Sequence, residues 1–151
     1  MYVSLTDKYT LSKKWLITGL KGPQNSFAAG IYKPKEGSDK AKFILYSTNS
    51  KSEDFKLLKI MSKSRDCKNQ KDLKISNKTV SYYESPIFKG QDEIEKGGKV
   101  PEDFFKEPHE VLTEHIMIWE QNGIGYGIDD RGNNLSFEDI KAVAQQIINT
   151  K

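Results

Sequence analysis

The chain has 151 residues, 36% of them hydrophobic, with a formal net charge of +3 and a single cysteine, Cys67. This length fits one domain over residues 1–151, the small charge does not by itself indicate nucleic-acid binding, and one cysteine excludes an intramolecular disulfide. No stretch approaches the roughly 18 to 20 apolar residues of a membrane span and the N-terminus lacks a signal-peptide core, so we expect a soluble chain that reaches a membrane only through a segment outside it.

Three strands are predicted in the first third of the chain. Lys14–Leu20 is a short apolar run that ends before Gly-Pro, residues 25–32 are rich in small and aromatic side chains, and Ala41–Thr48 is the clearest of the three. The next segment, Asp54–Ser64, is ambiguous because its apolar residues suit either a strand or a short helix. We interpret it as a strand.

A hairpin is predicted over residues 72–85. Apolar residues alternate on both sides of Ser76-Asn77-Lys78, which we interpret as a slightly longer turn. The region 86–108 carries Gly-Gly, three prolines and many charges, so we predict a long charged loop within the domain.

A second hairpin is predicted around Asn122-Gly123, because both residues tolerate the positive φ of a two-residue type I′ turn. Counting outward from this turn pairs four large side chains on one face, Trp119 with Tyr126 and Met117 with Ile128. This face is predicted to belong to the core.

The other face of this hairpin contains glycines. We place Ile116 and Ile118 opposite Gly127 and Gly125, where the missing side chains leave room for another element, such as a helix, to approach closely.

A helix is predicted to begin after Ser136. Ser136 is the expected N-cap, Asp139 follows three residues later, and Leu135 with Ile140 forms a hydrophobic staple. An apolar stripe continues at helical spacing through Phe137, Ile140, Val143, Ala144, Ile147 and Ile148. The predicted fold class is α+β: an antiparallel β-sheet of about five to seven strands with a C-terminal amphipathic helix packed on one face.

The acidic run in residues 129–138 invites comparison with a calcium loop. It fails the EF-hand spacing, because placing Gly132 sixth puts Gly127 first and Arg131 fifth, where oxygen ligands are required. We therefore predict no metal site here.

No catalytic constellation is evident in the sequence. His109 and His115 lie in no metal-binding or hydrolase pattern, and Cys67 has no partnered base, so we interpret it as a structural or incidental thiol. We predict no catalytic residues and no cofactor.

The C-terminal third resembles an uncharacterised bacterial domain family found in membrane-anchored, lipoprotein and sporulation-associated chains. The residues that carry the resemblance are Trp119, Gly123, Tyr126, Leu135, Ser136, Glu138 and Ala144. Residues 41–49 with 55–64 resemble the central hairpin of that family, and the first thirty residues resemble photosystem-associated and Mog1-like α+β proteins. The resemblance implies an extracytoplasmic accessory, sensory or binding domain; without a signal peptide, a cytoplasmic setting is the alternative.

The segment 56–78 is rich in lysine and contains the candidate partner-binding residues Lys63, Arg65, Lys68 and Lys71. A basic run of this kind is usually a solvated face, and it becomes a binding surface if its cations gather beside aromatic residues on one face of the sheet. We predict a non-catalytic binding domain for an anionic or protein partner, without sequence-specific nucleic-acid recognition. The alternatives are an enzyme with a site of scattered polar residues and a weak anion- or nucleic-acid-binding module.

Overall fold

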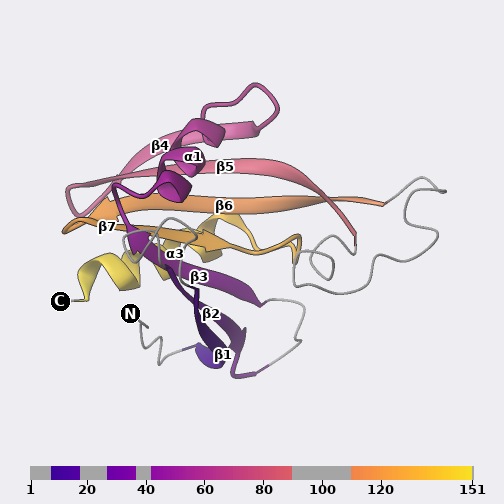
Figure 1. Cartoon of the computed structure of the whole chain (residues 1–151). Coiled ribbons are helices and arrows are strands. Elements are labelled where there is room, and N and C mark those ends of the chain that lie inside the picture. Colours follow the sequence, from indigo (N-terminus) through magenta and orange to yellow (C-terminus); the bar gives the residue numbers. More distant parts are fainter. Residues whose placement is uncertain (1–7, 18–26, 37–41, 90–109, 151) are drawn as a thin grey trace.

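The fold is built on a seven-stranded antiparallel sheet with the strand order β1-β2-β3-β7-β6-β5-β4 (Figure 1). The computed structural model describes residues 8–17, 27–36, 42–89 and 110–150. Its elements are β1 (Tyr9–Ile17), β2 (Phe27–Pro34), β3 (Phe43–Asn49), α1 (Glu53–Met61), β4 (Lys68–Ile75), β5 (Lys78–Phe88), β6 (Val111–Gln121), β7 (Ile124–Asp129) and α3 (Phe137–Asn149). The predicted α+β class and antiparallel sheet are confirmed.

The β6–β7 hairpin forms with the predicted register. Asn122 and Gly123 have φ values of 53° and 77°, as a type I′ turn requires. Trp119 lies opposite Tyr126 with the two rings stacked 5.2 Å apart, and Met117 lies opposite Ile128. All four side chains are buried in the main core cluster, which confirms the predicted core face.

The other face of the hairpin corrects our pairing by two residues. Ile118, not Ile116, lies opposite Gly127, and Ile116 lies opposite Asp129. A two-residue turn fixes this register once Trp119 is paired with Tyr126. The predicted close approach of another element is nevertheless confirmed at Gly125, where a Cβ atom would overlap the ring of Phe55 in α1. At Gly127 the close neighbour is Tyr46, which lies opposite it in the adjacent strand β3.

Helix α1 replaces the strand that we predicted over Asp54–Ser64. Ser52 caps its N-terminus, where the backbone N–H of Phe55 donates to Oγ of Ser52 over 3.2 Å, and Glu53 and Asp54 place negative charge in the first turn. The spacing of the apolar residues fits a strand as well as a helix, but only a helix places its free backbone N–H groups where the Ser52 side chain can accept from them. The resemblance of residues 55–64 to a strand of a central hairpin is therefore wrong.

Several predicted boundaries change. β1 begins at Tyr9 rather than Lys14, and residues 18–20 lie outside the described part of the chain. The β4–β5 turn is shorter than predicted, because Ile75 pairs with Lys78 and only Ser76 and Asn77 form the turn, both with positive φ. The charged loop does not begin at residue 86, since β5 continues to Phe88; residues 90–108 of that prediction lie outside the described residues.

Alternation along β5 and β6 gives the sheet two distinct faces. The Trp119 face carries Val80, Tyr82, Met117 and Trp119, which share a core cluster with the apolar stripe of α3. The Ile118 face carries Ser81, Tyr83, Ile116 and Ile118, and its apolar members cluster with Phe55 of α1. The two helices therefore contribute to different clusters.

The start of α3 is as predicted. The backbone N–H of Asp139 donates to Oγ of Ser136 over 3.1 Å, and Leu135 and Ile140 are both buried. The stripe residues are buried, apart from the half-buried Phe137, whose ring meets Tyr82 edge-on at 4.9 Å.

Replacing Trp119 with alanine should lower the free energy of unfolding by about 3 kcal/mol or more, because a large buried aromatic leaves a cavity that the core fills only partly. Urea unfolding would measure this change. A loss below about 1 kcal/mol would contradict a core position for Trp119.

Replacing Ser136 with alanine should cost about 1 kcal/mol through loss of the helix cap, while Ser136→Asp should retain most of the stability because aspartate also caps. The comparison of the two variants by thermal unfolding isolates the cap. Equal destabilisation by both variants would show that the Ser136 hydroxyl does not stabilise the protein as a helix cap.

Candidate functional site

A groove of about 690 Å³ lies on the Ile118 face between α1 and the β4–β5 hairpin. This volume falls within the range of roughly 300 to 1,000 Å³ that is typical of ligand sites. Its lining residues come from α1 and the turn after it (Phe55, Lys59, Ile60, Ser62 and Lys63), from the hairpin (Asp72, Asn77, Lys78, Thr79 and Ser81) and from β6 (Ile118, Trp119 and Glu120).

The position of α1 determines one wall of this groove. Phe55 is completely buried and its ring occupies the space over Gly125, where a Cβ atom would overlap it. One turn later, Nζ of Lys59 lies 3.4 Å from Oε2 of Glu120 in β6. These two contacts hold the helix on the strands next to the hairpin.

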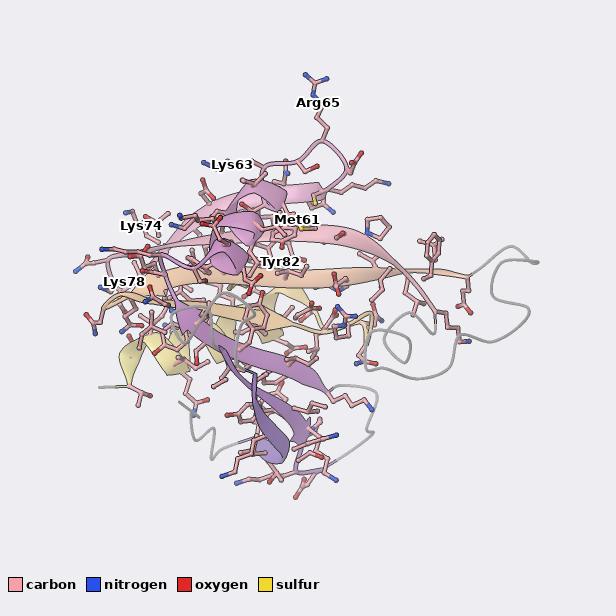
Figure 2. All side chains as sticks on the ribbon, in the orientation of Figure 1. Met61, Lys63, Arg65, Lys74, Lys78 and Tyr82 are labelled. Atoms are coloured by element: carbon pink, nitrogen blue, oxygen red, sulfur yellow. The ribbon has the colours of Figure 1, made fainter. Side chains whose placement is uncertain are left out.

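Two lysines, Lys63 and Lys78, line the groove. Within the described residues no carboxylate lies in ion-pair distance of Lys63 or Lys78. Asp72, the nearest acidic residue in β4, accepts a hydrogen bond from the Ser81 hydroxyl over 2.8 Å. Figure 2 shows Lys63 and Lys78 at the same end of the molecule as Lys74, whose Nζ donates to the Thr79 hydroxyl over 2.8 Å.

The four predicted partner-binding residues do not share one surface. Lys63 lines the groove, and Arg65 projects away from the sheet in the α1–β4 connection (Figure 2). Lys71 lies on the opposite, Trp119 face, with Nζ 4.1 Å from the centre of the Phe137 ring. Lys68 lies opposite Glu84 in the register of β4 and β5, beyond an irregularity in β4 that separates it from Lys71. The structure thus brings Lys63 together with Lys78 and separates it from Lys68 and Lys71.

A polar cluster around the partly buried His115 was not predicted from the sequence. Nδ1 of His115 lies 2.6 Å from Oδ2 of Asp130, and Nε2 lies 3.7 Å from Oε1 of Glu84. His115 lies within β6. Continuing the register of the Asn122-Gly123 hairpin beyond β7 brings His115 opposite Asp130, so the signal was present in the turn.

Asp130 is fully buried and organises the chain between β7 and α3. Its carboxylate accepts hydrogen bonds from the backbone N–H groups of His115, Gly132 and Leu135, at 2.8, 3.0 and 3.0 Å. Buried carboxylates need such partners, and here three of them are backbone groups. Asp130 therefore acts as a structural anchor of this turn.

A second buried polar cluster joins Glu114, Asp129 and Arg131. One guanidinium nitrogen of Arg131 lies 2.9 Å from Glu114 and 3.6 Å from Asp129. Burial raises the pKa of the Asp129 carboxyl well above its usual range, the neighbouring Glu114 raises it further, and Arg131 opposes both effects only in part. Two buried carboxyl groups thus share one cation, and Asp129 keeps its proton to a higher pH than an ordinary aspartate.

The Cys67 thiol is not activated. The side chain is buried in the cluster of the Ile118 face, and this burial raises the pKa of the thiol, although a hydrogen bond to Ser85 lowers it in part. A nucleophilic cysteine needs the opposite shift, so this environment supports a structural role.

The part of the chain that the structure describes contains no group of three or more histidine, cysteine, aspartate or glutamate side chains placed to hold a metal ion. None of its helices is long and apolar enough to cross a bilayer.

Comparisons with family models, with curated proteins and with solved structures found no match to this chain. The resemblance of the C-terminal third to a bacterial domain family therefore stays a prediction.

Replacing Asp129 with asparagine should change how stability depends on pH. The pKa of Asp129 is raised in the folded state, so its stabilising contribution is complete below the unfolded pKa of about 3.9 and is lost as pH rises through the folded pKa. Asparagine keeps an acceptor for the Arg131 N–H and cannot ionise.

The stability of Asp129→Asn relative to wild type should therefore increase as pH rises from about 4. Chemical unfolding at several pH values would measure it, with the exposed Asp66→Asn as a control. A stability difference that does not change with pH would show that Asp129 ionises normally in the folded protein.

Proposed function

We propose that the protein is a non-catalytic binding domain whose groove between α1 and the β4–β5 hairpin receives an anionic partner. The observation that carries this proposal is the placement of Lys63 and Lys78 at the groove without a carboxylate partner among the described residues. Lysines without a carboxylate partner can form ion pairs with a ligand without first breaking an ion pair within the protein.

Electrostatic attraction to the groove extends beyond direct contact. Between exposed charges it decays over a Debye length of about 10 Å at 0.1 M salt, so association with an anion should weaken as salt increases. Asp72 and Glu120 offset part of the charge, but Glu120 is paired with Lys59 and Asp72 accepts from Ser81. The available positive charge is therefore that of Lys63 and Lys78.

The surroundings of His115 favour binding over catalysis. Both ring nitrogens of His115 lie near carboxylates, and Asp130 is engaged by three backbone N–H groups. A general base must have a nitrogen free to reach a substrate proton. This environment supports a structural role for His115.

The distribution of the basic segment disfavours a nucleic-acid interface. Lys63 and Lys71 lie on opposite faces of the sheet, whereas a bound strand requires a continuous basic track. The ring next to Lys71, Phe137, is half-buried beside Tyr82 and offers no open stacking surface.

We also infer that α3 packs on the Trp119 face, which leaves the Ile118 face to α1 and the groove. The shared core cluster and the edge-on contact of Phe137 with Tyr82 support this arrangement. We infer an extracytoplasmic setting from the resemblance of the C-terminal third alone.

Reversing both groove charges in Lys63→Glu/Lys78→Glu should weaken binding of fluorescent poly-glutamate about tenfold or more at low salt. Each lost ion pair contributes up to about 1 kcal/mol, and the new carboxylates repel the probe. Fluorescence anisotropy at low and high salt would measure both the affinity and its salt dependence.

The matched control is Lys42→Glu/Lys141→Glu, which makes the same charge change away from the groove. Comparable weakening by the two variants would show that binding depends only on the net charge of the protein. Unchanged binding by the groove variant would show that the groove is not the binding site.

A further inference from the structure

Helix α1 presents an apolar stripe to solvent. Leu57, Ile60 and Met61 are 54%, 67% and 38% exposed, whereas Phe55 on the inner side is completely buried. Their spacing of three and four residues places them on one side of the helix. Exposed apolar side chains that gather in one place, rather than singly, mark interaction surfaces in soluble proteins.

The apolar stripe is continuous with the groove. Ile60 belongs to the stripe and also lines the groove, beside Lys59 and Lys63. A ligand that contacts Ile60 therefore has apolar surface on one side and the ammonium groups of Lys63 and Lys78 on the other.

We propose that the groove and the stripe together bind an acidic segment of a partner protein that carries large apolar side chains. Its carboxylates pair with Lys63 and Lys78, and its apolar side chains cover Leu57, Ile60 and Met61. The inference rests on the proposed function, because it assigns the chemistry of the partner at the same groove.

Two features favour a protein segment over other anions. A small free anion would satisfy the lysines and leave the exposed stripe uncovered, at the usual cost of about 25 cal/mol for each Å² of apolar surface in water. A bilayer is flat. It would contact the exposed side of α1 without reaching Ser81 and Ile118, the sheet residues that line the groove. Side chains on a peptide can reach both surfaces.

The test compares three probes with the intact chain. The first is a short labelled peptide that mixes glutamate with leucine, the second is a peptide of equal charge with serine in place of leucine, and the third is a vesicle of equal parts phosphatidylglycerol and phosphatidylcholine. The key variant is Ile60→Ser/Met61→Ser, which removes apolar surface and no charge. Its control is Phe88→Ser/Val111→Ser, which removes two exposed apolar side chains elsewhere.

We expect the leucine-containing peptide to bind wild type at least about tenfold more tightly than the serine peptide. Ile60→Ser/Met61→Ser should abolish this advantage, so that the variant binds the two peptides with equal affinity. The substituted residues are exposed, so the fold should persist, and thermal unfolding checks this.

Several results would overturn the inference. Equal affinity for both peptides, with binding still dependent on Lys63 and Lys78, would leave the proposed function in place and remove the apolar contribution. Preferential binding of the vesicles, lost in Ile60→Ser/Met61→Ser, would identify a lipid surface instead. Absence of binding to all three probes would contradict the proposed function as well.

Discussion

Two glycines in β7, Gly125 and Gly127, determine how closely α1 and Tyr46 can approach the Ile118 face of the sheet. A Cβ atom at Gly125 would overlap the Phe55 ring, and one at Gly127 would overlap Tyr46. Large aromatic side chains therefore lie directly on the backbone of β7, which pairs with both β3 and β6. Glycine weakens a strand by itself, and here the burial of two aromatic rings compensates for that weakness.

The position of α1, and with it the groove, follows from this contact. Phe55 is the one residue of α1 that is fully buried, and Leu58 packs partly buried against the same cluster, so the helix is held mainly through these two side chains. The exposed ion pair of Lys59 with Glu120 adds little. The remainder of the helix then stands above the β4–β5 hairpin and encloses the groove. A helix held along one side presents most of its surface to solvent, which explains how the apolar stripe and Lys63 come to lie together.

Local signals predicted the elements that turn chemistry and capping determine. Asn122-Gly123 gave the β6–β7 register, and Ser136 gave the start of α3. The same register, continued by one residue, places His115 opposite Asp130, and continued by two residues it places Glu114 opposite Arg131, so these polar contacts were predictable from the hairpin alone. We missed them because we analysed these residues as motifs and not as cross-strand neighbours.

Features that depend on contacts distant in the sequence were not predictable. Helix α1 is not one of them, because its cap at Ser52 is a local signal that we did not weigh against the strand pattern of Asp54–Ser64. The basic segment 56–78 was considered as one surface, yet it spans a helix, a connection and an edge strand whose side chains alternate between faces. Only the fold shows that Lys63 is close to Lys78 and remote from Lys71.

The central claim is that the surface formed by α1 and the β4–β5 turn is where this protein meets its partner. Titration of the isotope-labelled chain with unlabelled poly-glutamate, followed by the amide chemical shifts in NMR, tests that claim residue by residue. The account predicts that the largest shift changes fall in Lys59–Lys63 and Asn77–Ser81. Changes concentrated in β1–β3 or around Lys68 and Lys71, with those two segments unaffected, would contradict it.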